Sequence, residues 1–104
     1  MFHPAAKVTI IAERLLQQGI TKIIDSAGAT GYTIVDGSGK GEHFHPPSDR
    51  AAVVSAFSIV RIEALVKDIE QAREIGRRVA ETYFKQYSGI VYVSPAEVLR
   101  PERF

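Results

Sequence analysis

The chain has 104 residues, 45% of them hydrophobic, and its 13 basic and 12 acidic residues leave a formal net charge of +1. We expect residues 1–104 to form a single small domain, and the near-neutral charge argues against bulk electrostatic binding to nucleic acid or to an anionic membrane. The absence of cysteine excludes a disulfide framework, a thiolate nucleophile and a cysteine-based zinc site.

The first part of the chain alternates strand and helix patterns. Residues 7–13 are rich in β-branched side chains and predict a strand. Residues 14–27 have helical spacing, and Gly28 is a suitable stop. Their apolar face comprises Leu16, Ile20, Ile23, Ile24 and Ala27. Residues 29–35 then predict a second strand, which is followed by a long polar loop over residues 37–56.

The second part repeats the plan after that loop. Residues 57–66 predict a third strand, and Asp68 with Gln71 resembles a capping box at the start of a helix. The buried stripe of this helix is Ile69, Ala72, Ile75, Val79, Ala80 and Tyr83. Residues 89–94 predict a fourth strand. The order βαββαβ indicates an α+β, ferredoxin-like fold with an antiparallel four-stranded sheet.

A glycine-rich run, Asp36-Gly-Ser-Gly-Lys-Gly41, follows the second predicted strand. Bare backbone amides between glycines can bind phosphate oxygens, and Lys40 adds a positive charge. The spacing is not that of a Walker A loop. A flexible hinge is the alternative explanation of the run.

The predicted strands are apolar on both faces, with Ile10 beside Ile11 and Ile34 beside Val35. Two helices cover only one face of a sheet, so we expect another copy of the chain to cover the second face. Arg61 and Glu63 fall on one face of the third strand. They pair either across such an interface or with each other at an edge exposed to water.

Four stretches resemble the PII family of signalling proteins, in its SbtB-like, carboxysome-associated branch. They are KVTIIAERLL, IIDSAGATGYTIVDGSGKG, FSIVRIEAL and RVAETYFKQYSGIVYVSPAEVL, in one order over nearly the whole chain. The resemblance implies a homotrimer of ferredoxin-like subunits with adenine-nucleotide sites between subunits. It also implies a long T-loop, here about residues 37–56, that responds to ligand and docks onto a partner.

The implied function is signalling in response to AMP or ADP, with ATP or cyclic AMP as further ligands, linked to bicarbonate uptake or to carboxysomes. The implied partner is a bicarbonate transporter or a carboxysome-related protein, and neither a cofactor nor nucleic acid is expected. Because the chain has neither a signal-peptide pattern nor an apolar run approaching roughly 18 residues, we expect it in the cytoplasm, with membrane association only through such a partner.

The resemblance also assigns candidate nucleotide-binding residues. The T-loop root would contact phosphate, and residues before the last strand would line the adenine and ribose side. Glu13 would lie near the ribose, and Thr33 would come from the adjoining subunit. The whole set is Glu13, Thr33, Gly37, Ser38, Gly39, Lys40, Gly41, Ser88, Gly89, Ile90, Arg100 and Arg103. Lys40 and Gly41 are also the candidate bicarbonate site.

Several of these residues have simpler explanations. Glu13 can favour a helix dipole, Gly89 can only permit a turn, and Arg100 and Arg103 can lie in a solvated tail. The loop also departs from its relatives, because it lacks tyrosine and has His43 and Pro46 where the SbtB-like pattern has arginines. The cysteine-bearing C-terminal extension is absent as well, which puts a redox switch in doubt.

Other functions remain as alternatives. His43 and His45 form an H-x-H pattern, which is the only support for a metal-binding trimer of CutA type, and two ligands are too few for a closed site. We therefore expect no metal site. An enzyme is not expected, since the chain has no asparagine for an acylphosphatase site and no evident acid–base pair, although weak nucleotide hydrolysis stays an alternative. A purely structural oligomer is the remaining possibility.

Overall fold

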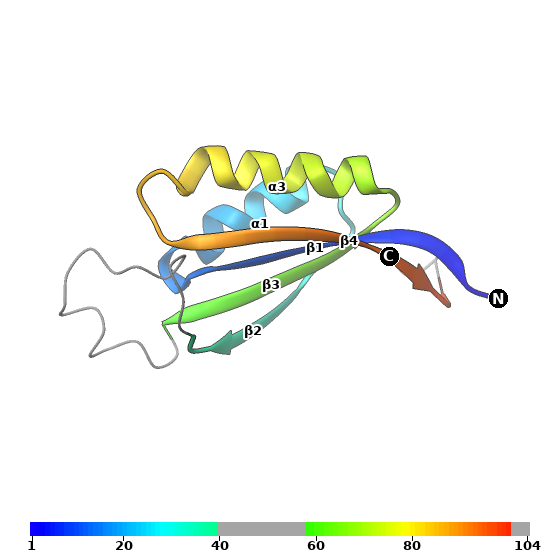
Figure 1. Cartoon of the computed structure of the whole chain (residues 1–104), viewed down its shortest axis with the longest axis horizontal. Coiled ribbons are helices and arrows are strands. Elements are labelled where there is room, and N and C mark those ends of the chain that lie inside the picture. The colour runs from blue at the N-terminus through cyan, green and yellow to red at the C-terminus, as the bar shows by residue number, and fades with distance from the viewer. Residues whose placement is uncertain (40–57, 101–104) are drawn as a thin grey trace.

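The protein is described by a computed structural model covering residues 1–39 and 58–100. Its elements are β1 (His3–Glu13), the 3₁₀ helix η1 (Arg14–Leu16), α1 (Gln17–Ser26), β2 (Thr33–Gly37), β3 (Ile59–Val66), α3 (Ile69–Tyr83) and β4 (Gly89–Val98). The strands pair antiparallel in the order β2-β3-β1-β4. The predicted α+β, ferredoxin-like fold is confirmed (Figure 1).

Both helices lie on one face of the sheet, where they enclose the core (Figure 1). Every second residue of β1 and β3 points into this layer, as the alternation of a pleated strand requires. Its largest fully buried side chains include Val8, Ile10, Val60, Ile62, Ile20, Ile24, Ile75 and Val79. The predicted apolar stripes of the two helices are confirmed except at Ala80, which is half-buried and is not part of the core cluster.

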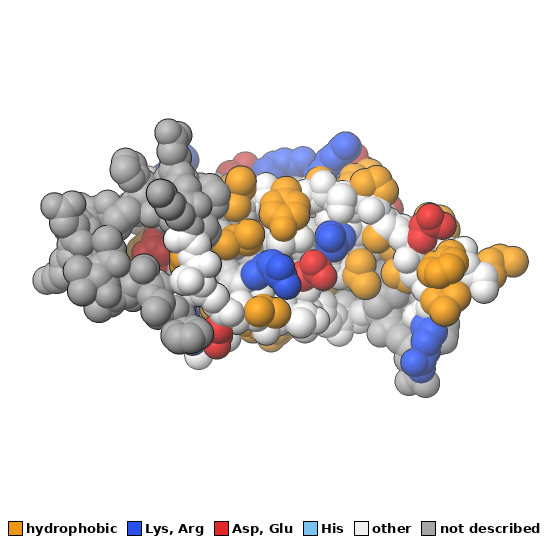
Figure 2. All heavy atoms as spheres, turned by 60° about the horizontal axis from the view of Figure 1, so that its bottom comes forward, with side chains coloured by type: hydrophobic (Ala, Val, Ile, Leu, Met, Phe, Trp, Pro, Cys, Tyr) orange, Lys and Arg blue, Asp and Glu red, His pale blue; other side chains and the backbone are white. Residues whose placement is uncertain are grey.

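Neither of the described helices lies over the opposite face of the sheet, and Figure 2 shows hydrophobic side chains there around a few charged ones. Val35, Ile90 and Tyr92 are 45%, 37% and 46% exposed. Lys7 Nζ lies 3.8 Å from Glu63 Oε2, so Glu63 pairs with Lys7 within the same chain. The prediction of a sheet that is apolar on both faces is confirmed, and we refer to this side as the open face.

The start of the first helix differs from the prediction, because residues 14–16 form a 3₁₀ turn and the α-helix begins only at Gln17. Neither Glu13 nor Leu16 caps this helix with its side chain. The tighter turn instead satisfies a backbone donor, since the Gln17 N–H bonds the carbonyl of Arg14. At the other end Gly28 has a φ of 91°, which confirms it as the stop.

The second strand lies later than predicted, at Thr33–Gly37 instead of residues 29–35. The N–H of Ala29 bonds the Ile24 carbonyl and so completes the end of α1 instead of joining the sheet. Gly37 is the last paired residue of β2 and lies opposite Ile59. The predicted loop therefore starts one residue later, and residues 40–57 lie outside the part of the chain that the structure describes.

The first and last strands are longer than predicted. They stay paired from Ala12 and Gly89 to His3 and Val98, and so form a two-stranded ribbon that projects beyond β3 (Figure 1). From the sequence pattern, the last strand was predicted to end at residue 94, before Pro95. This proline is tolerated because β4 is the edge strand of the sheet, where one side of the strand needs no partner.

The second helix begins as predicted. The Asp68 side chain accepts a hydrogen bond of 2.8 Å from the Gln71 N–H, as an N-cap does. The reciprocal bond of a capping box is shifted by one residue, because Gln71 Oε1 accepts from the N–H of Lys67 and not of Asp68. Gln71 thereby ties the end of β3 to the start of α3.

Candidate functional site

Three strand ends carrying predicted site residues lie at one end of the sheet. Ile59 of β3 pairs with Gly37 on one side and with Glu13 on the other. Gly89 opens β4 opposite Ala12, next to Glu13. Neighbouring strands are about 4.8 Å apart, so Gly37 and Glu13 are roughly 10 Å apart across Ile59. The fold thus brings the glycine-rich run to the same edge as the start of β4.

Glu13, the last residue of β1, contacts the residue that precedes β4 at this edge. Its Oε2 accepts a hydrogen bond of 2.8 Å from the Ser88 N–H, a contact between residues 75 positions apart. Glu13 makes no capping bond to the helix that follows it. Its carboxylate is instead directed toward the α3–β4 connection, where it binds Ser88. Two predicted site residues, Glu13 and Ser88, are therefore in direct contact.

Gly89 is held close to neighbouring atoms. A Cβ built on it would lie 2.4 Å from two ring carbons of Phe84 and 3.0 Å from the carbonyl oxygen of Ile11. The glycine is thus required by packing, and not only by a turn. Ile90 follows it on the open face, opposite Ile11.

Gly37, in contrast, has open space around it. A Cβ at this position would meet no atom of residues 1–39 and 58–100 within 4 Å. Packing among the described residues therefore does not demand a glycine here. The space beside the backbone leaves room for close approach by another group, which is one use of glycine in anion-binding loops. Ser38 and Gly39 follow outside the strand.

Arg14 is a residue at this edge that the sequence reasoning missed. Its N–H donates a 2.7 Å hydrogen bond to the Ser58 carbonyl, and its Nη1 lies 3.3 Å from Oδ1 of Asp36. In the sequence, Asp36 precedes the predicted loop over residues 37–56 and Ser58 follows it, so Arg14 contacts residues on both sides of that loop. The signal in the sequence was a basic residue directly after Glu13 at the end of the first predicted strand.

Two predicted residues lie far from this edge within one chain. Thr33 is at the other end of β2, four residues and therefore about 13 Å from Gly37. Arg100 follows the far end of β4, whose length from Gly89 is about 30 Å. A single chain does not bring either of them to Glu13 and Ser88. Lys40, Gly41 and Arg103, like His43 and His45, lie outside the described residues.

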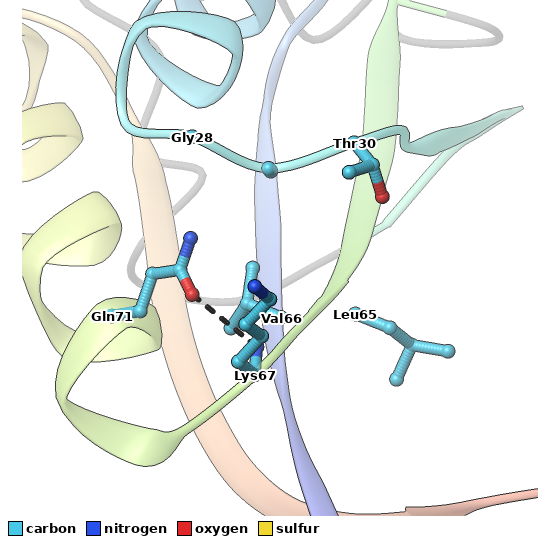
Figure 3. A pocket seen from close by; sticks show the side chains of 7 residues that line it. Gly28, Thr30, Leu65, Val66, Lys67 and Gln71 are labelled. Atoms are coloured by element: carbon cyan, nitrogen blue, oxygen red, sulfur yellow. Dashed lines mark hydrogen bonds between the residues drawn. The ribbon is translucent and has the colours of Figure 1, made fainter. Parts of the chain in front are cut away.

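A shallow hollow lies elsewhere, where the end of α1 passes the end of β3 and the start of α3 (Figure 3). It is lined by Gly28, Ala29, Thr30, Leu65, Val66, Lys67 and Gln71, none of them a predicted site residue. The Gln71 amide is used in structural bonds there, to the Lys67 N–H and to the Ala27 carbonyl. We therefore regard the hollow as a packing feature, and the strand-end edge as the candidate site.

Two further features of the described residues bear on function. No group of three or more histidine or acidic side chains in residues 1–39 and 58–100 is arranged to hold a metal ion. Neither described helix combines the length and the apolar character needed to cross a bilayer.

Comparison with known proteins places this fold in a family. The model of the nitrogen regulatory protein P-II family matches residues 5–103. A PII-like signalling protein from Thermus thermophilus is 32% identical, with 99% of this chain and 97% of that chain covered and a TM-score of 0.77.

The protein CPII from Thiomonas intermedia K12, solved with ADP, AMP and acetate, is 30% identical, with 100% and 97% of the two chains covered and a TM-score of 0.79. The same protein with ADP, AMP and bicarbonate matches at 30% identity, with 97% and 99% covered and a TM-score of 0.75. The resemblance read from the sequence is confirmed, and the chain belongs to the nitrogen regulatory protein P-II family.

Proposed function

We propose that this protein is a PII-like regulatory sensor that binds AMP or ADP at the strand-end edge and signals through the T-loop. The observation that carries the proposal is the contact between Glu13 and Ser88. It fixes the α3–β4 connection at the end of the sheet from which the glycine-rich run also departs. A nucleotide can then contact backbone amides of the run with its phosphates and the Ser88–Ile90 segment with its nucleoside.

The phosphate side of the proposed site consists of Gly37, Ser38 and Gly39, with Lys40 and Gly41 next in the sequence. Backbone N–H groups in such a run bind anions without help from many charged side chains. A site with few cationic side chains favours a mono- or diphosphate over a triphosphate, because the triphosphate carries more negative charge. Bound CPII structures contain ADP and AMP, which supports this choice of ligand for a relative of 30% identity.

Bicarbonate is the proposed second ligand, near Lys40 and Gly41, since CPII has also been solved with bicarbonate. We accordingly propose a role in inorganic-carbon uptake or carboxysome function, through a transporter or a carboxysome-related partner. Ligand binding changes the loop only by the free energy with which it favours one loop state over another. The role is regulatory and needs no catalytic group.

The proposed assembly is a homotrimer in which the open faces of the sheets are turned inward. The exposed Val35, Ile90 and Tyr92 then leave water. Thr9, at the centre of this face, is 1% exposed and its hydroxyl has no hydrogen-bond partner in the described part of the chain. Thr33 and Arg100, which are remote from the edge in one chain, would reach the site of a neighbouring subunit.

Calorimetric titration of AMP, ADP, ATP and cyclic AMP, with GMP as the control, tests the proposal. We expect micromolar binding of AMP or ADP at one site per chain, no binding of GMP, and tighter binding in bicarbonate. Lack of binding by all adenine nucleotides would overturn the proposal and leave the glycine run as a hinge. Release of free phosphate during the titration would instead indicate the alternative, nucleotide hydrolysis.

A further inference from the structure

We propose that Arg61 of one subunit forms an ion pair with Glu63 of the partner subunit, and that this pair fixes how two copies of the chain meet on the open face. The inference rests on the proposed homotrimer, which it deepens by naming a charged contact between subunits. The occupant of the open face is a second copy of this chain, identified by charge complementarity.

The register of the sheet places Arg61 in an apolar row of the open face. Arg61 pairs with Val35 of β2 on one side and with Ile11 of β1 on the other, and Ile11 in turn pairs with Ile90 of β4. Residues that are paired across strands point to the same face of a sheet. The neighbours of the Arg61 guanidinium in its own row are therefore all hydrophobic.

Within one chain, Arg61 and Glu63 do not pair. Arg61 is exposed, and it makes no hydrogen bond or ion pair with residues 1–39 and 58–100. Glu63, two residues further along β3, is directed to Lys7 of β1 instead. The open face thus carries a cation that has no acid beside it among the described residues.

The Glu63 carboxylate can still accept hydrogen bonds. Its Oε2 lies 3.8 Å from Lys7 Nζ, which is an ion pair but is too long for a hydrogen bond. An ionised carboxylate has about four acceptor positions, and the Glu63 side chain is 40% exposed. Arg61 and Glu63 therefore supply an unused donor and an unused acceptor on the same face.

Burial of the open face makes an acceptor for Arg61 necessary. When Val35 and Ile90 leave water in the assembly, Arg61 leaves water with them. A guanidinium cannot lose its charge, and a buried charge without a partner is strongly destabilising, whereas a hydrogen-bonded pair offsets this cost. Glu13, the acid at the end of β1, is already bonded to the Ser88 N–H. Glu63 of the partner subunit is the remaining acid on the described strands of this face.

A closed ring of identical subunits can satisfy every such pair. In a cyclic assembly a patch on one copy contacts a different patch on the next, so position 61 of each subunit can meet position 63 of its neighbour. The two positions are about 7 Å apart along β3. Without these pairs, sheets turned inward would bring copies of Arg61 together, and like charges repel strongly away from water.

A solvated surface charge is the competing explanation for Arg61. Exposed charges contribute little to stability, and their reversal changes little. Arg77 on α3 is the matched control, because it is also an exposed arginine and lies on the opposite side of the sheet. It pairs at 3.4 Å with Glu74 of the same helix, with side chains 55% and 51% exposed.

The test mixes two charge-reversed chains and measures assembly by sedimentation velocity and native mass spectrometry. Arg61→Glu leaves acids at both positions and Glu63→Arg leaves cations at both, so each chain alone sets like charges against each other at every interface. We expect each variant alone to form smaller species, and the mixture to recover trimers that contain both chains. Arg77→Glu should assemble as the wild type does.

The mixture separates a contact between chains from one within a chain, since neither variant can form the pair internally. A mixture that dissociates as the separate chains do would overturn the inference. Arg61→Gln removes the charge without reversing it, and should raise the dissociation constant of the assembly more than about 10-fold. Wild-type assembly of Arg61→Gln would also overturn the inference, and this result decides the question even if the reversed chains do not fold.

Failure of this inference is distinct from failure of the proposed sensor. A monomeric wild type that binds AMP or ADP in calorimetry would overturn the ion pair and the trimer but not the nucleotide site. A wild type whose assembly depends on Arg61 but which binds no adenine nucleotide would support the ion pair and overturn the sensor.

Discussion

Gly89→Ala should destabilise the protein through a steric conflict at the start of β4. The added methyl group would lie 2.4 Å from two ring carbons of Phe84 and 3.0 Å from the Ile11 carbonyl oxygen. The ring is the end of a side chain and can turn away, but the carbonyl belongs to the backbone of β1, paired here with Ile90. Overpacking of this kind costs about 1–3 kcal/mol.

Urea unfolding at one fixed protein concentration measures this effect, since the stability of an oligomer depends on concentration. Gly37→Ala is the matched control, because its methyl group meets no atom within 4 Å in the described part of the chain. We expect the control to stay within about 0.5 kcal/mol of the wild type. It should nevertheless weaken nucleotide binding, since Gly37 lies at the proposed phosphate side.

Phe84→Leu removes the two ring carbons in conflict and turns the test into a double-mutant cycle. Gly89→Ala should cost less in the Phe84→Leu background than in the wild type, with a coupling of about 0.5–2 kcal/mol. A Gly89→Ala variant within about 0.5 kcal/mol of the wild type would refute the reasoning. Equal costs in both backgrounds would show that Phe84 is not the obstacle.

Three further substitutions test other parts of the structure. Ile75→Ala removes a fully buried side chain and should cost about 2–5 kcal/mol in urea unfolding; a cost below about 1 kcal/mol would contradict the described core. Asp68→Ala removes the N-cap of α3 and should cost about 0.5–2 kcal/mol in thermal unfolding, whereas Asp68→Asn keeps most of the stability, so equal losses would contradict a capping role. Val35→Lys adds a charge opposite Arg61 on the open face and should convert the trimer to smaller species in sedimentation velocity; an intact trimer would argue against the inward-facing sheets.

The sequence predicted those parts of the fold that depend on local patterns. Asp68 and Gln71 are close in the chain, and the apolar spacing of α1 and α3 needs only neighbouring residues, so these predictions were confirmed. The start of β1 was placed too late and the end of β4 too early, because both are set by the pairing of the distant residues His3 and Val98. A local pattern carries no information about where such pairing ends.

The candidate site was predicted in part for the same reason. Glu13 and Ser88 were each singled out, but their contact depends on the sheet bringing together residues 75 positions apart. Arg14 was overlooked because its importance comes from Asp36 and Ser58, which are remote in sequence. The hypothesis that Thr33 and Arg100 belong to a neighbouring subunit stays a prediction.

A crystal structure of the protein with ADP tests the central claim most directly. The account predicts ADP at the strand-end edge, with its phosphates on the backbone of Gly37–Gly39 and its nucleoside beside Ser88 and Gly89, where two subunits of a trimer meet. ADP bound in the hollow lined by Thr30 and Lys67, or away from the glycine-rich run, would contradict it.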